Sequence, residues 1–153
     1  MQRRVRSPGF TLIELATALV VVGILVGIAA VPFARLLNRY AVRAAREALA
    51  AGIAHARAAA VAGGGAELVI DLHGARYSIH TAGGGAGAPY AAPVDLRAQY
   101  GVTLTSDGQP MDTVVLRFDA LGVGRMTSRT FRVRRGSAEA GLTVATYGRV
   151  RRW

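Results

Sequence analysis

The sequence contains no cysteine, and its aromatic residues are few. Without cysteine there can be no disulfide, no thiolate metal ligand and no cysteine nucleophile. The histidines, His55, His73 and His80, lack the i, i+4 spacing that places two zinc ligands on one helix face. Aromatic residues make up only 7% of the 153 positions, which argues against a large core and favours one compact domain with an appendage.

Lysine is also absent, so all 19 basic residues are arginine, and with nine carboxylates they give a formal net charge of +10. This charge has two explanations: an anionic partner, or a composition biased toward arginine, alanine and glycine. Net charge governs solubility and non-specific association rather than fold. Charge alone therefore does not choose between the two explanations.

Sequence motifs of catalytic sites are missing as well. The glycine-rich run at 83–87 lacks the Lys-Ser/Thr of a phosphate-binding loop, and there is no nucleophile elbow. Asp107 and Asp112 are conceivable as a carboxylate pair, but both fall among turn-forming residues and are better interpreted as turn residues. We therefore expect no catalysis, no metal and no cofactor.

A long apolar stretch occupies the N-terminal part of the chain. Leu15 to Ala34 are twenty consecutive positions without a charge. At about 1.5 Å rise per residue, a helix of that length covers the roughly 30 Å hydrocarbon core of a bilayer. Arginines occur on both sides of the stretch, namely Arg3, Arg4 and Arg6 before it and Arg35, Arg39, Arg43 and Arg46 after it. The sequence thus predicts a membrane-spanning helix whose orientation the charges leave open.

One carboxylate, Glu14, lies at the start of this apolar region. An ionisable side chain at membrane depth is costly, so Glu14 must either reach the head groups or find a partner. The string Gly9-Phe10-Thr11-Leu12-Ile13-Glu14-Leu15 resembles the type III signal peptide of type IV pilins and type II secretion pseudopilins. This resemblance favours a partner for Glu14.

The resemblance implies that a prepilin peptidase of the inner membrane cuts after Gly9 and methylates the new N-terminus at Phe10. Residues 1–9 would then be a basic leader whose loss leaves 16 arginines and nine acids, a side-chain charge of +7. Glu14 would pair with the amine of a neighbouring subunit's Phe10 and so set the register of subunits in a filament. The implied partners are other pilins or pseudopilins, the peptidase and the inner membrane.

The helix is expected to continue well beyond the membrane, over 10–62 in all, with 10–34 as its transmembrane part. Gly63-Gly64-Gly65 would end it, because glycine is the favoured stop. A helical wheel separates an arginine face from a face of mostly small residues, which we expect to pack on the rest of the domain. The small-residue face comprises Leu37, Ala41, Ala44, Ala48, Ala51, His55 and Ala59.

The remainder, 63–153, has short alternating segments bounded by turn residues, which predict a small, mainly antiparallel β domain and an α+β fold. The expected strands are Glu67–Leu72, Arg76–His80, Val102–Thr105, Thr113–Phe118, Thr130–Arg134 and Leu142–Tyr147. The first two would form a hairpin around His73-Gly74. The segment Thr81–Pro93 is expected to be a surface loop.

Two C-terminal strings narrow the resemblance. Phe118-Asp119-Ala120-Leu121-Gly122 and the closing Tyr147-Gly148-Arg149, after a helix and a β domain, resemble the GspH/FimT family of minor pilins and pseudopilins over nearly the whole chain. This implies a pilin-like fold, a single-pass inner-membrane anchor and a periplasmic domain. The implied function is a minor subunit of a type II secretion pseudopilus, contributing to protein secretion, or of a type IV pilus.

The basic C-terminus suggests an alternative function within the same resemblance. Gly148, Arg149 and Arg151 match the Gly-Arg-x-Arg tail associated with DNA binding in FimT-like proteins during natural transformation. From Arg117 onward there are nine arginines and two acids, and guanidinium groups bind phosphates in a salt-sensitive way. The expected residues for double-stranded DNA are Arg132, Arg134, Arg149, Arg151, Arg152 and Trp153. Against this, a basic tail is often a frayed end, and Trp153 is equally suited to plug the core.

Overall fold

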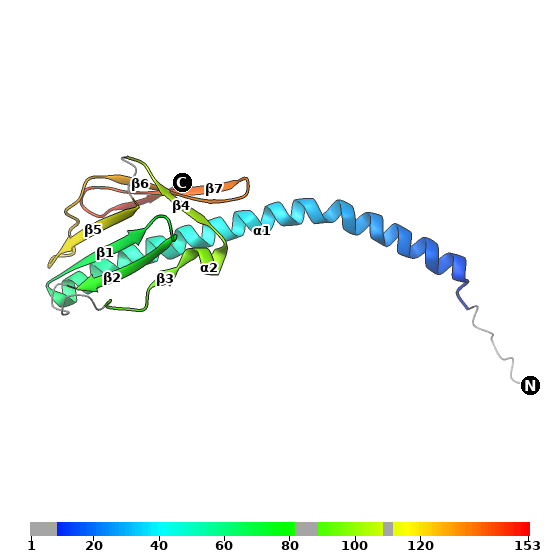
Figure 1. Ribbon diagram of the computed structural model, residues 1–153, viewed down its shortest axis with the longest axis horizontal. Coiled ribbons are helices and arrows are strands. Elements are labelled where there is room, and N and C mark those ends of the chain that lie inside the picture. Colours follow the sequence, from blue (N-terminus) through cyan, green and yellow to red (C-terminus); the bar gives the residue numbers. More distant parts are fainter. Residues whose placement is uncertain (1–8, 82–88, 109–111) are drawn as a thin grey trace, which may run out of the picture. The chain divides into compact units, whose positions relative to one another are not determined.

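The computed structural model describes residues 9–81, 89–108 and 112–153 (Figure 1). The leader arginines Arg3, Arg4 and Arg6, and the part of the predicted loop at 82–88, lie outside the described residues. The chain forms two compact units that divide after Leu36. The two units are described one at a time below.

Helix α1, Leu12–Gly63, runs through both units. It begins with a capping box: the Thr11 hydroxyl accepts from the Glu14 backbone N–H at 3.2 Å, and the Glu14 carboxylate accepts from the Thr11 N–H at 3.5 Å. It ends where Gly64 adopts a left-handed conformation, with φ +76°, which favours glycine. The helix therefore stops at the three glycines, as the sequence predicted.

In the first unit, the apolar side chains of α1 are exposed. The helix contains a stretch long and apolar enough to cross a membrane, and none of that stretch is buried in the described structure. Exposed members include Leu19, Val22, Leu25, Ile28 and Phe33. Burial of this apolar surface would have to come from lipid or from other chains.

In the second unit, α1 buries a stripe of residues spaced three or four apart. Its members are Val42, Ala45, Leu49, Ile53, Ala56 and Ala60. The predicted packing face was wrong: of its seven residues only Ala59 is buried, and His55 is exposed. The larger apolar side chains of Val42, Leu49 and Ile53 gain more from leaving water than alanines do, so they set which face turns inward.

Two four-stranded antiparallel sheets complete the second unit (Figure 1). The first has the order β3-β2-β1-β5, with β1 Gly65–Asp71, β2 Arg76–Thr81, β3 Val94–Asp95 and β5 Thr113–Asp119. The second has the order β4-β6-β7-β8, with β4 Thr103–Ser106, β6 Arg129–Arg135, β7 Ala138–Val144 and β8 Val150–Arg152. A short helix, α2 Leu96–Tyr100, follows β3.

The α+β prediction and the β1–β2 hairpin are confirmed. The last predicted strand, Leu142–Tyr147, was placed too late, since β7 begins at Ala138 and ends at Val144. Strands β3 and β8 and helix α2 were not predicted. Each is five residues or shorter, too short for a clear hydrophobic period.

A glycine in the middle of α1 allows close packing against β2. A Cβ built on Gly52 would lie 2.6 Å from the ring of Tyr77, and the Tyr77 hydroxyl donates to the Ala48 carbonyl at 3.1 Å. Burial, with a smaller contribution from Tyr100, raises the pKa of Tyr77. Glycine at position 52 is unfavourable for the helix itself, but the missing side chain allows close contact between α1 and β2.

Candidate filament and nucleic-acid interfaces

The predicted cleavage junction lies immediately before α1. Gly9 and Phe10 are exposed, non-helical residues, and Phe10 has 86% of its surface exposed. Glu14 is also exposed and belongs to the first helical turn, where the positive end of the helix dipole favours a carboxylate. An enzyme can therefore reach the Gly9–Phe10 peptide bond in the described structure.

Glu14 has a local role that the sequence prediction missed. The pattern Thr11-x-x-Glu14 is the signature of a capping box and was readable from the sequence. Only one of the two carboxylate oxygens makes the capping contact, and its 3.5 Å length makes it a weak hydrogen bond. Glu14 therefore keeps an acceptor available for a cation from outside the chain.

The predicted DNA-binding residues lie on β6 and on or directly beside β8, the last strand of the second sheet. Register and alternation place Arg132 and Arg134 of β6 on the sheet face that points away from the core, together with Arg151 of β8. We call this surface the outer face of the second sheet. Its other members are Thr103, Thr105, Thr130, Glu139, Gly141 and Thr143.

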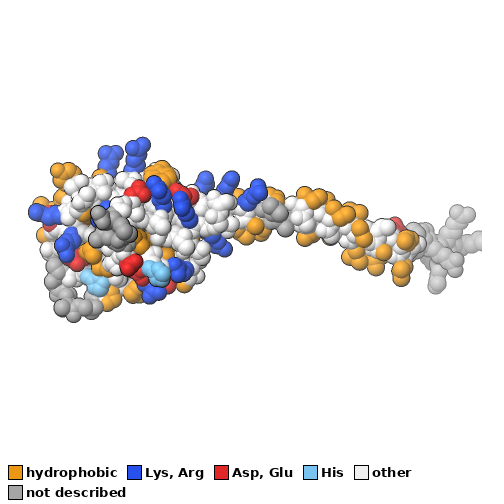
Figure 2. All heavy atoms as spheres, turned by 45° about the horizontal axis from the view of Figure 1, so that its top comes forward, with side chains coloured by type: hydrophobic (Ala, Val, Ile, Leu, Met, Phe, Trp, Pro, Cys, Tyr) orange, Lys and Arg blue, Asp and Glu red, His pale blue; other side chains and the backbone are white. Residues whose placement is uncertain are grey.

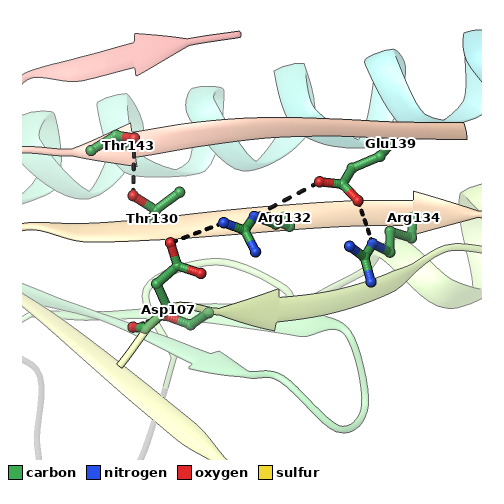
Figure 3. Close-up of polar contacts among 7 residues, drawn as sticks. Asp107, Thr130, Arg132, Arg134, Glu139 and Thr143 are labelled. Atoms are coloured by element: carbon green, nitrogen blue, oxygen red, sulfur yellow. Dashed lines mark hydrogen bonds and ion pairs between the residues drawn. The ribbon is translucent and has the colours of Figure 1, made fainter. Parts of the chain in front are cut away.

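Two of these arginines already form ion pairs with carboxylates of the same chain (Figure 3). Arg132 lies 3.3 Å from Asp107 and 3.7 Å from Glu139, and Arg134 is hydrogen-bonded to Glu139. Sequence reasoning missed both acids, although the tight β6–β7 turn makes Glu139 the cross-strand partner of Arg134. A phosphate binding at Arg132 or Arg134 would compete with these ion pairs.

The C-terminal residues form an ordered edge strand. Trp153 exchanges two backbone hydrogen bonds with Gly141, at 3.0 and 3.1 Å, and its indole covers Gly141 so closely that no Cβ would fit there. The tryptophan keeps 51% of its surface exposed. The tail is therefore neither a frayed end nor a plug in the core.

Arg152 is separated from the other tail arginines. Its partner across the strands is the buried Leu142, and its guanidinium lies 3.0 Å from Glu47 of α1. Arg46 of α1 donates to the main-chain oxygen of Trp153 at 3.0 Å. These contacts attach β8 to the helix, so Arg152 has a structural partner instead of a free guanidinium.

Arg149 and Arg151, by contrast, are brought together. Gly148, with φ +82°, closes the turn that places Arg149 beside β8, and both arginines line a hollow of about 390 Å³ with Thr143. Across the described ranges, neither arginine has an ion-pair partner. Figure 2 shows basic side chains standing clear of the second unit's surface, with acidic ones set among them.

Comparison with known proteins supplies the context for both regions. Residues 4–30 match the prokaryotic N-terminal methylation motif. Among curated proteins no match was found. The motif match covers the predicted junction, Glu14 and most of the apolar stretch.

Solved structures resemble the chain over most of its length. The type IV minor pilin FimU of Pseudomonas aeruginosa strain PAO1 has a TM-score of 0.58 and 25% identity, covering 75% of this chain and 90% of FimU. The minor pseudopilin EpsH from the Type 2 Secretion System of Vibrio cholerae has a TM-score of 0.56 and 15% identity, covering 73% of this chain and 95% of EpsH. The EpsH likeness shows the fold alone.

Proposed function

Because this chain carries the prepilin methylation motif and a pilin-like fold, we propose that it is a type IV pilin-like protein and a minor subunit of a type IV pilus or type II secretion pseudopilus. A prepilin peptidase removes residues 1–9 and methylates Phe10. Until assembly, the apolar part of α1 anchors the subunit in the inner membrane with the β domain in the periplasm.

The observation that carries the proposal is the exposed apolar half of α1 with Glu14 at its beginning. Such a surface is covered by lipid before assembly and by neighbouring helices afterwards. Glu14 would be costly in either setting without a cation. Cleavage after Gly9 creates one at Phe10, and a neighbouring subunit's Phe10 amine then pairs with the Glu14 carboxylate.

Two substitutions separate the pairing role of Glu14 from its capping role. Glu14→Gln keeps a side chain that suits a capping box but removes the charge. Thr11→Ala removes the cap, at a cost of about 1 kcal/mol in helix stability, and keeps the charge. We expect Glu14→Gln to abolish incorporation into filaments, measured by immunoblotting sheared filaments, and Thr11→Ala to assemble.

Circular dichroism of both variants in detergent would show whether the helix is intact. Normal incorporation of Glu14→Gln would refute pairing between subunits. Failure of Thr11→Ala alone would assign Glu14 to the helix cap instead.

Of the two systems, a type IV pilus has the better support, because the sequence identity to this chain is 25% for FimU and 15% for EpsH. Deleting the gene should then reduce surface pili and leave the type II secreted proteins in the medium. The reverse outcome would assign the subunit to a secretion pseudopilus, in which its contribution is to protein secretion.

DNA binding is a second candidate, favoured by Arg149 and Arg151, which line one hollow and have no ion-pair partner among the residues that the structure describes. Trp153 offers an aromatic ring on the same edge strand, suited to stacking on an exposed base. Arg132 and Arg134 contribute less in this proposal, because Asp107 and Glu139 already bind them. The proposed DNA site therefore lies at the edge of the second sheet and not in its middle.

The test is duplex binding by the full chain in detergent at several salt concentrations. Arg149→Gln with Arg151→Gln should weaken binding and make the slope of log K against log salt shallower by about two, near 0.9 per phosphate contact. Arg76→Gln with Arg117→Gln removes the same charge from the first sheet and is the matched control. Equal loss in both variants would indicate general charge attraction and would contradict a tail site.

A further inference from the structure

A second hollow lies in the folded unit, between α1 and the turn that joins β6 to β7. It has a volume of about 290 Å³, and its lining is Arg39, Arg43, Ser137, Ala138 and Glu139. A Cβ built on Gly136 would lie 3.0 Å from the Asn38 side chain. The turn therefore rests against the helix, and the walls of the hollow are α1, this turn and the start of β7.

Two guanidinium groups, those of Arg39 and Arg43, line the hollow. Arg39 and Arg43 are one helical turn apart, so they share a face of α1, and neither forms an ion pair within the described part of the chain. Glu139 is already engaged by Arg132 and Arg134. These two arginines and the Ser137 hydroxyl make a donor set suited to a phosphate group, which accepts bidentate hydrogen bonds from guanidinium.

The chain itself keeps this hollow near the end of the apolar stretch. Arg39 follows Ala34 by five residues, a separation that even an extended chain spans in about 18 Å. Tyr40, next to Arg39, is 63% exposed, and tyrosine is enriched where membrane meets water. In a membrane-anchored subunit, the hollow is thus within reach of the lipid head groups.

We propose that Arg39, Arg43 and Ser137 bind the phosphate of an anionic phospholipid while the subunit is anchored in the membrane. The guanidinium groups and the hydroxyl donate to the non-bridging phosphate oxygens. This inference rests on the membrane anchoring in the proposed function, but it requires neither filament assembly nor DNA binding. The bound head group would hold the folded unit at the bilayer surface.

The experiment titrates the full chain, in micelles of an uncharged detergent, with soluble short-chain phosphatidylglycerol, and follows arginine Nε–Hε NMR signals. Short-chain phosphatidylcholine and inorganic phosphate are the comparison ligands. We expect saturable shifts at Arg39 and Arg43 with phosphatidylglycerol, and binding weakened about tenfold or more by Arg39→Gln with Arg43→Gln. Arg149→Gln with Arg151→Gln, which removes the same charge from the tail, should leave the affinity unchanged.

Several outcomes would overturn the proposal. Equal affinity for inorganic phosphate would identify a site for a free anion, and an equal loss in the tail variant would indicate general charge attraction. If phosphatidylglycerol does not bind but Arg39→Gln with Arg43→Gln blocks filament assembly, the occupant is an acidic side chain of a neighbouring subunit. Thermal melting of each variant checks that it is folded. Ser137→Ala leaves both arginines in place and should weaken binding by a smaller factor than Arg39→Gln with Arg43→Gln.

Discussion

The two halves of α1 are one continuous helix in two different environments. From Leu12 to Ala29 and from Pro32 to Leu36 its apolar residues are exposed all around, whereas from Leu37 to Gly63 a single stripe is buried against the sheets. The difference is visible in the pattern of apolar residues, which is continuous in the first half and spaced by three or four in the second. A continuous apolar surface needs a partner outside the chain, and a periodic one finds its partner within the fold.

The largest effect should come from truncating the buried stripe. Leu49 is fully buried, and Leu49→Ala should lower the free energy of unfolding by about 2–5 kcal/mol. Leu25→Ala removes the same atoms from the exposed half, where 60% of the leucine surface is accessible, and should change this free energy little. Urea denaturation of the full chain in detergent, followed by the fluorescence of Trp153, measures both. A similar loss of unfolding free energy in the two variants would contradict the difference in burial between the two halves of α1.

Replacing one glycine in each half of α1 by alanine also compares the two halves. Gly52→Ala would place a Cβ against the Tyr77 ring, and such overpacking should destabilise the folded unit by about 1–3 kcal/mol. Gly23→Ala meets nothing within 4 Å in this chain, so it should raise helix stability by up to about 1 kcal/mol. Denaturation and helical circular dichroism measure the two effects. A stabilising Gly52→Ala would contradict the close contact between α1 and β2.

A smaller, pH-dependent effect on stability is expected at the turn after β5, which is hydrogen-bonded to the second half of α1. Arg57 donates to the Gly122 carbonyl at 3.0 Å. Within that turn, hydrogen bonds from the Val123 N–H and then from Arg125 and the Leu121 N–H lower the pKa of Asp119 below its ordinary 3.8. Because the folded-state pKa is the lower one, Asp119 stabilises the fold above pH 3.8 and loses this effect as pH falls through the lowered value.

Asp119→Ala should therefore reduce the melting temperature at neutral pH. The difference from the unsubstituted protein should shrink as the solution is acidified, as melting curves over a pH series would show. Leu121→Ala, which alters the same turn at a side chain that is 82% exposed, is the control and should show no such pH dependence. A constant difference for Asp119→Ala at every pH would mean that its charge has no part in holding the turn.

The sequence predicted the features that depend on local chemistry. The glycines after Ala62 and the alternation around Phe131 each have a strong physical consequence close by in the chain. The capping box of Thr11 and Glu14 is equally local, but it was not predicted. The packing face of α1 was predicted wrongly because small residues were weighted above Val42 and Leu49. Tertiary contacts decide that face.

The site at the C-terminus was less predictable. Whether Arg149, Arg151 and Arg152 act together depends on β8, a strand of three residues that exists only because it pairs with β7. Once β8 pairs, its successive side chains point to opposite faces of the sheet. Arg152 then lies beside Glu47, and Arg151 lies on the outer face. The acids that occupy Arg132 and Arg134 likewise depend on strand register, which composition does not reveal.

The most direct measurement is the intact mass of the subunit purified from membranes of a cell with an active prepilin peptidase. We expect a chain that begins at Phe10 and carries one methyl group, which leaves a cationic amine for the Glu14 carboxylate of a neighbour. A mass that still includes Arg3 and Arg4 would contradict this, because Phe10 would then have no free amine and the exposed helix would have no partner for its acid.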